Sequence, residues 1–147
     1  MKEFHGRVIQ AQNWTGEAIV SHQGFNTLAS CQTSALLATS KKIIVSDQNN
    51  KDLYKKNITG KALCLPETIG STTGGMVIQT IAVRSLAPKA WLFSHHIDPL
   101  AASGIILSNV WNDAGLIAID ELGDDFLDAV KSGDKIIIKE DGTVIVE

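Results

Sequence analysis

The stretch GKALCLPETIGSTTGG, residues 60–75, joins a continuous apolar run to a loop of glycine and hydroxyl side chains. The apolar run, residues 60–66, ends at Pro66 and is typical of a strand that is buried on both faces. Residues 76–86 follow, and their apolar side chains have the spacing of a helix. The stretch therefore predicts a strand, a polar loop and a helix in that order, which is a building unit of α/β domains.

The chain after this unit continues to alternate between strands and helices. Residues 89–94 and 116–120 predict strands. Residues 98–110 predict a helix with Asp98 as its N-cap and Pro99 at its first position. Residues 124–130 predict a short helix, because Asp124 and Asp125 suit the positive end of a helix dipole. The middle of the chain thus has the βαβα order of an α/β domain.

The two ends of the chain have strand patterns instead. Residues 6–12 and 16–21 predict two strands, residues 42–46 predict a third, and residues 47–57 predict a loop. Residues 26–37 predict a helix capped by Asn26, with a structured loop as the alternative. The closing segments, residues 135–139 and 143–147, flank an Asp-Gly pair that is typical of a hairpin. We expect the last strand to pair with the N-terminal strands. The fold expected for residues 1–147 is a single α/β domain: a barrel-like mixed sheet flanked by two or three helices.

Composition excludes several classes of protein. Thirteen Lys and Arg against 16 Asp and Glu give a net charge of −3, without the basic surface that nucleic acids or anionic membranes require. No apolar run is long enough for a signal peptide or a membrane span, so we expect a cytoplasmic protein. Cys31 and Cys64 lie 33 positions apart without a CxxC pattern. We expect two buried free thiols and no cysteine-ligated metal in this chain.

The loop Gly70-Ser71-Thr72-Thr73 is the strongest candidate for a functional site. The first turn of a helix leaves N–H groups free at the positive end of its dipole, and glycine allows a ligand to approach the backbone closely. These features predict a site for a carboxylate or a phosphate, with Ser71 as the reactive hydroxyl. Ser and Thr are also the usual helix N-caps, so a purely structural role for Ser71 is the alternative. The loop matches neither phosphate-binding glycine motif nor a Gly-x-Ser-x-Gly elbow.

Two other clusters resemble metal sites at first sight. His95 and His96 are adjacent at the end of a predicted strand, where neighbouring side chains point to opposite sides, so one metal ion rarely binds both. The acidic residues around them do not have the spacing of a calcium loop, and a solvated face explains them better. We therefore assign no metal ligand to this chain. A free-standing metal enzyme remains a weak alternative. The acidic residues are Asp120, Glu121, Asp124, Asp125 and Asp128.

Several motifs in a fixed order resemble the small, swivelling subunit of the aconitase X enzymes. The resemblance extends over most of the chain, and the order of the motifs is more specific than any one of them. The motifs are GRV (6–8), GEAIVS (16–21), NITGK (57–61), LPETIGSTT (65–73), APKA (87–90) and DPLAASGIIL (98–107).

The resemblance implies a swivelling β/β/α domain that docks on a large subunit. In that family the large subunit carries the iron or iron–sulfur centre, and the enzymes dehydrate small hydroxy acids such as phosphomevalonate and cis-3-hydroxy-L-proline. The resemblance makes Ser71 the proton acceptor, and Gly70, Thr72 and Thr73 are candidate substrate-binding residues because they adjoin it in the loop. The expected function is the small subunit of an iron-dependent hydro-lyase, active only with its large subunit. The alternative is a non-catalytic anion-binding or regulatory module that uses the helix start at residues 70–73.

The chain departs from the family pattern in the loop after Ser71, where residues 72–75 are TTGG instead of a serine-rich run or a Gly-Ser pair, and at two further places. Residues 24–30, GFNTLAS, replace the usual Gly-Gly-Val-Asp stretch. Ile69 precedes Gly70 where phosphomevalonate-type members carry Arg or Lys. Of these two further departures, the second brings the loop closer to the hydroxyproline-type enzymes and weakens the case for a phosphorylated substrate, and the first leaves the identity of the acid open.

Overall fold

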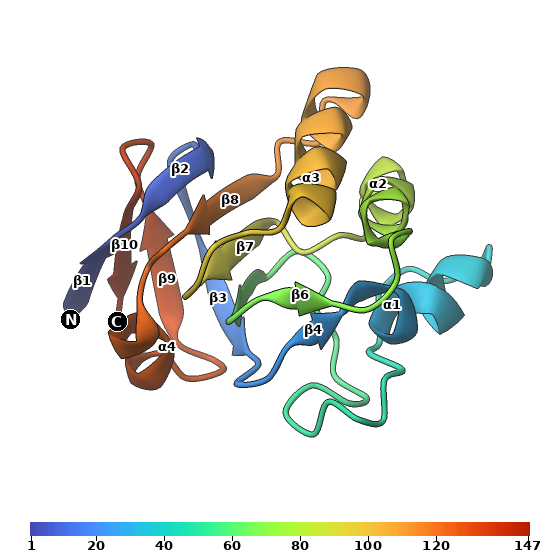
Figure 1. Ribbon diagram of the computed structural model, residues 1–147, viewed down its shortest axis with the longest axis horizontal. Helices are drawn as coiled ribbons and strands as arrows, with labels where there is room; N and C mark the ends of the chain where they lie inside the picture. The colour runs from blue at the N-terminus through green and yellow to red at the C-terminus, as the bar shows by residue number, and fades with distance from the viewer.

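The structure is a computed structural model that describes residues 1–147. Its main element is a mixed sheet of eight strands, in the order β1-β10-β9-β3-β5-β7-β8-β2, accompanied by a two-stranded pair and four helices (Figure 1). The strands are β1 (Lys2–His5), β2 (Arg7–Gln10), β3 (Trp14–Val20), β4 (Phe25–Asn26), β5 (Ala62–Leu65), β6 (Thr68–Ile69), β7 (Ala90–Phe93), β8 (Ile117–Asp120), β9 (Lys135–Ile138) and β10 (Thr143–Val146). The helices are α1 (Thr27–Leu36), α2 (Gly74–Val83), α3 (Pro99–Asn112) and α4 (Asp124–Ala129).

The sheet nearly closes into a barrel. β3, β5, β7 and β8 run parallel, and the remaining strands pair antiparallel at both ends of the strand order. β1 and β2, the two ends of that order, are separated in the chain by Gly6 alone. A Cβ atom at Gly6 would stand 2.5 Å from the carbonyl oxygen of Asp120, so only glycine fits where the chain passes from one end of the sheet to the other. The closing hairpin pairs with the N-terminal part of the chain as expected, through β9 with β3, whereas the last strand, β10, pairs with β1, a strand that the sequence did not predict (Figure 1).

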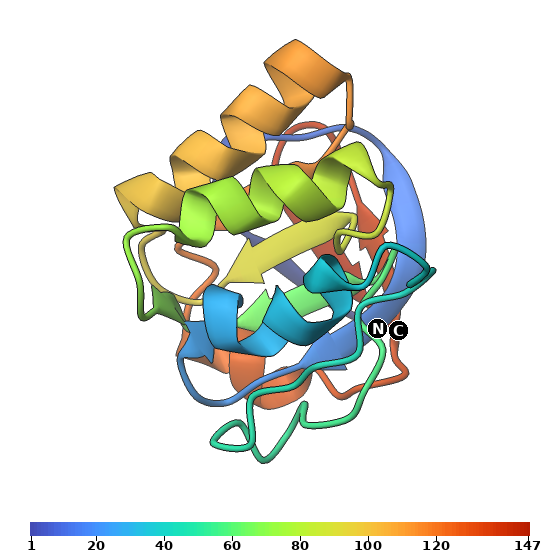
Figure 2. The ribbon, with the colours of Figure 1, turned by 90° about the vertical axis from the view of Figure 1, so that its right-hand side faces the viewer.

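Strand alternation divides the interior into two cores. In β5, Ala62 and Cys64 face the core inside the barrel, whereas Leu63 and Leu65 face the core beneath the helices. The buried strands β7 and β8 alternate in the same way, which explains their continuous apolar sequences. α1, α2 and α3 cover one side of the sheet (Figure 2), and the short α4 packs against the barrel core. The predicted α/β fold, a barrel-like mixed sheet with flanking helices, is confirmed.

The strand predicted over residues 42–46 is wrong. This segment makes one isolated bridge, between Ile44 and Asn57, although Ile43 and Val45 are buried. Two of its backbone N–H groups bond to side chains, Ile43 to Thr59 Oγ1 at 2.7 Å and Ile44 to Ser34 Oγ at 3.0 Å, whereas Val45 N donates to the carbonyl oxygen of Lys56 at 3.0 Å. An apolar run alone does not distinguish a strand from a loop whose side chains fill the core.

Helix boundaries moved by a few residues from those predicted. α2 begins at Gly74 instead of residue 76, and α3 extends to Asn112. The predicted N-caps of α1 and α3 are confirmed: Asn26 Oδ1 accepts from Ala29 N at 3.1 Å, and Asp98 caps α3. The longest helix, α3, has 14 residues, and none of the helices has the length and hydropathy needed to cross a bilayer.

Candidate functional site

A cavity of about 210 Å³ lies where three helices begin. α1 starts at Thr27, α2 at Gly74 and α3 just after Asp98, and all three residues line the cavity. Figure 2 shows the three helices starting on the same side of the molecule. Asn26 caps α1 and Asp98 caps α3, whereas α2 has no side-chain cap, so the start of α2 is the one best placed to attract an anion. The cavity is lined by Thr27, Thr68, Ile69, Gly70, Ser71, Gly74, Ile78, Asp98, Leu100 and Ala101.

The short parallel pair of β4 and β6 brings two distant segments together at this cavity. Asn26 lies opposite Ile69, so the cap of α1 is beside the loop that precedes α2. Gly70 has a φ of +99°, and a Cβ atom there would stand 2.7 Å from Cγ of Asn26. The close backbone approach expected at Gly70 is therefore an approach to the cap of α1. Glycine at this position holds α1 and the Ser71 loop in contact.

Ser71 is exposed and lies three residues before the first residue of α2. Its carbonyl oxygen accepts from Gly74 N at 3.2 Å, and its Oγ accepts from Thr73 N at 3.1 Å. The N-cap of α2 is Thr73, whose side chain makes no capping bond. Ser71 is thus not the helix cap, and its hydroxyl remains reachable from the cavity.

The surroundings of Ser71 favour negative charge on its oxygen. Thr73 places two groups against Ser71 Oγ, its N–H at 3.1 Å and its hydroxyl oxygen at 2.8 Å. The N–H groups of Gly75 and Met76, in the first turn of α2, have no hydrogen-bond partner. Hydrogen bonds donated to an oxygen stabilise its charged form, and free N–H groups at a helix start attract anions. The arrangement can hold an anion beside the Ser71 hydroxyl.

Asp98 is the one charged side chain in the lining. Its Oδ2 accepts from the N–H groups of Leu100 and Ala101 at 3.0 Å each, and its Oδ1 accepts from the Thr68 hydroxyl. The start of α3 therefore compensates the charge of this carboxylate. No Lys or Arg lines the cavity, so any side-chain cation that neutralises a bound anion has to come from outside this lining.

A buried ion pair supports the segment before α3. The Asp120 side chain is fully buried and accepts from Arg7 Nε at 2.9 Å and Nη2 at 2.6 Å. The same carboxylate accepts from the N–H of Ile97 at 2.9 Å, one residue before Asp98. Burial alone would raise the pKa of Asp120, but the hydrogen bonds from Arg7 and Ile97 and the nearby positive charges outweigh it and lower that pKa.

The histidine pair and the cysteines lie away from the cavity. His95 Nε2 is 2.9 Å from Asp124, whereas His96 Nδ1 is 3.4 Å from Glu121, so the two rings have separate partners. No three His, Cys, Asp or Glu side chains lie close enough to hold a metal ion. The expected free, buried thiols are confirmed: Cys31 belongs to the core beneath the helices and Cys64 to the barrel core.

Sequence reasoning located the loop but not the whole lining. Gly70 and Ser71 line the cavity, whereas Thr72 and Thr73 do not, and Thr73 reaches the site through its bonds to Ser71. Thr68 was missed, because a two-residue strand carries no recognisable pattern. Thr27 lies in the divergent segment 24–30, which the sequence flagged without naming a residue.

The fold and the cavity together define a swivel-type β/β/α domain that presents helix starts and a reachable hydroxyl. The chain belongs to the aconitase X swivel domain family, whose pattern matches residues 3–146. A crystal structure of Thermococcus kodakaraensis aconitase X in its holo form superposes with a TM-score of 0.83 at 27% identity, covering 100% of this chain and 99% of the other. A solution NMR structure of a UPF0107 protein, at 24% identity and a TM-score of 0.79, shares the fold.

Curated relatives are named phosphomevalonate dehydratase small subunit. The protein of that name from Methanocaldococcus jannaschii is 29% identical over 136 residues, which cover 92% of this chain and 90% of the relative. The one from Methanocella arvoryzae is 33% identical over 91 residues, and this match spans 62% of each chain.

Proposed function

We propose that this chain is the small subunit of an aconitase X-type dehydratase, a hydro-lyase that acts on a small hydroxy acid. Family membership and the names of the relatives support the reaction class. The observation that carries the proposal is the position of Ser71: its hydroxyl is exposed at the cavity where three helices begin.

In this proposal Ser71 accepts the proton that the substrate loses. The substrate carboxylate binds at the start of α2, near Gly70 and the free N–H groups of Gly75 and Met76. The carbon next to that carboxylate then faces Ser71 Oγ, which acts in its deprotonated form and takes a proton from this carbon. The electrons of the carbon–hydrogen bond form the new double bond, and hydroxide leaves with the electrons of the carbon–oxygen bond. The N–H of Thr73 donates to the same oxygen, and in this proposal the Thr73 hydroxyl, 2.8 Å away, donates as well, so that both stabilise its charged form. A covering partner would exclude water and strengthen each of these interactions.

The large subunit completes the site in this account. The residues of this chain do not fit an iron or iron–sulfur centre, because no cluster of possible ligands exists and the two cysteines lie in separate cores. The iron centre included in the proposal is therefore held by residues of the large subunit, and this chain alone has no activity. Two free thiols suit a reducing compartment, and we place the complex in the cytoplasm.

The substrate that we propose is a small hydroxy acid, and no phosphate group of it binds to residues of this chain. A phosphate carries close to two negative charges near neutral pH, and a site for it usually includes Arg or Lys. This cavity has neither, and Ile69 lies at its edge. The names of the relatives favour phosphomevalonate instead. Assays of the reconstituted enzyme with phosphomevalonate and with cis-3-hydroxy-L-proline separate the two substrate classes.

The test is reconstitution with the large aconitase X subunit from the same organism. We expect elimination of water only when both chains are present. The alternative function is an anion-binding or regulatory module, which the three converging helix starts favour. Calorimetric titration of the isolated chain with a carboxylate such as citrate, together with no turnover in the mixture, would support that module and reject the dehydratase.

A further inference from the structure

The outer helices α2 and α3 carry no charged residue. They comprise 10 and 14 residues in a chain of which 20% is charged. A surface helix ordinarily has a charged or polar face opposite its buried face. Here the exposed positions are mostly apolar, with Thr80, Ser103 and Asn112 as uncharged polar exceptions, and we call these positions the α2–α3 face. Its large apolar side chains are Met76, Val83, Leu100, Ile106, Val110 and Trp111, all more than a third exposed.

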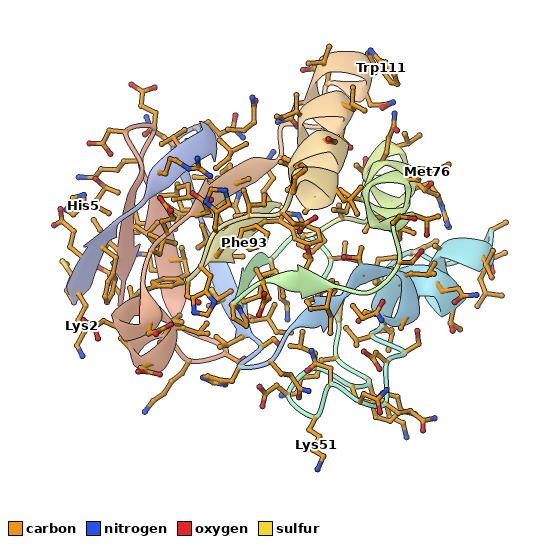
Figure 3. The ribbon with its side chains drawn as sticks, viewed as in Figure 1. Lys2, His5, Lys51, Met76, Phe93 and Trp111 are labelled. Carbon is orange, nitrogen blue, oxygen red and sulfur yellow. The ribbon has the colours of Figure 1, made fainter.

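The α2–α3 face points outward. The two helices lie side by side in the outer layer (Figure 2), and Met76 and Trp111 lie on the outside of the molecule (Figure 3). Met76 is 70% exposed and Trp111 is 68% exposed, although both are large apolar side chains. Depletion of charge together with exposed Met and Trp is the composition of the core of a protein–protein interface.

We propose that the α2–α3 face is the surface on which the large subunit docks. This inference rests on the proposed function, which supplies the partner. One end of the face is the cavity itself, because Leu100 lines the cavity and Met76 lies in the first turn of α2. A partner that closes over Ser71 therefore meets this face first. Its complementary surface is apolar and uncharged, since an unpaired charge buried against α2 and α3 would find no partner there.

The test measures the affinity of this chain for the large subunit from the same organism. Trp111→Lys and Val83→Lys each place a charge on the face, far along the chain from Ser71. Leu36→Lys is the matched control, because Leu36 is 76% exposed in the last turn of α1 and lies outside the face. A lysine suits the C-terminal end of all three helices, so folding should be unchanged. Thermal unfolding of each isolated variant checks this.

We expect the dissociation constant to rise at least tenfold for Trp111→Lys and Val83→Lys and to stay within twofold for Leu36→Lys. Turnover at saturating large subunit should be preserved, because the cavity is untouched. Variants on the face that bind as tightly as the wild type would overturn the inference while leaving the dehydratase proposal standing. Sedimentation showing a dimer of this chain that Trp111→Lys dissociates, with binding to the large subunit unchanged, would assign the face to a second copy and also overturn it. A wild-type chain that binds no large subunit would overturn the proposed function itself.

Discussion

Gly75 and Gly104 lie directly against each other where α2 and α3 cross. A Cβ atom at Gly104 would stand 2.6 Å from the carbonyl oxygen of Gly75, and one at Gly75 would stand 2.6 Å from the carbonyl oxygen of Leu100. Two glycines thus let the helix backbones touch. Because α2 begins at the cavity and α3 begins beside it, this contact sets the distance between two of the helix starts that form the site.

Gly104→Ala should therefore destabilise the fold. The added methyl group meets backbone atoms of Gly75 in α2, and overpacking of this kind costs about 1–3 kcal/mol, partly offset by up to about 1 kcal/mol of helix propensity. We expect a net loss of about 1–2 kcal/mol in urea unfolding. Gly74→Ala is the control, because its Cβ would be 3.8 Å from Thr27, an ordinary contact. Equal free energies of unfolding for the two variants would contradict the prediction, because they would show that α2 and α3 can move apart without loss of stability.

Gly70→Ala should disturb both the cap of α1 and the position of Ser71. Alanine at a φ of +99° is strained and its methyl group would collide with Asn26, so we expect a loss of about 2–3 kcal/mol. Gly60→Ala isolates the strain, because Gly60 has a φ of +72° with no atom within 4 Å of the added Cβ. It should lose about 1 kcal/mol. Chemical unfolding of both variants measures the difference, and a Gly70→Ala variant no less stable than Gly60→Ala contradicts the contact with Asn26.

The Arg7–Asp120 pair should make stability depend on pH. The folded-state pKa of Asp120 lies below its ordinary value, so the pair stabilises the fold above about pH 4 and this contribution disappears as the pH falls below that value. Arg7→Met should therefore destabilise the protein strongly at pH 7 and progressively less below pH 4. Lys61→Met, which breaks the more exposed pair with Glu17, should change little at either pH. A loss in Arg7→Met that is the same at pH 7 and pH 3 would exclude the ion pair as its cause.

Both thiols should be unreactive in the folded chain. Burial raises the pKa of Cys31 to about 12, and burial also raises the pKa of Cys64. Since the thiolate is the reactive form, a disulfide reagent at pH 7.5 should modify neither cysteine until the chain unfolds. Absorbance of the released thiolate, with and without guanidinium, counts the reactive groups. Fast modification of the native chain would require an opening of the core that the structure does not show.

Most helices and strands of the fold follow from local patterns in the sequence. The buried strands read as continuous apolar runs, Asp98-Pro99 marked the start of α3, and Asp141-Gly142 marked the closing hairpin. The apolar side chains of residues 42–46 enter the core as those of a strand would, but their backbone bonds partly to the side chains of Ser34 and Thr59 and forms no continuous ladder. Such bonds join residues that lie ten or more positions apart, and no local sequence pattern predicts them.

The candidate site was predictable in its loop and not in its surroundings. Glycine and hydroxyl residues before an apolar helix identified Gly70 and Ser71, and the resemblance to a family gave Ser71 a role. Thr27 and Thr68 reach the cavity only because β4 and β6 pair, and each of these strands has two residues. The convergence of three helix starts likewise depends on tertiary packing, which local sequence patterns do not predict.

The central claim is that Ser71 Oγ accepts the substrate proton, and turnover of Ser71→Ala in the two-subunit enzyme tests it most directly. The control is Ser40→Ala, which removes a hydroxyl that lies outside the cavity lining. With equal occupancy of the large subunit, the account predicts a fall in kcat of about 10²–10⁴-fold for Ser71→Ala and none for Ser40→Ala. Turnover of Ser71→Ala within tenfold of the wild type would contradict it.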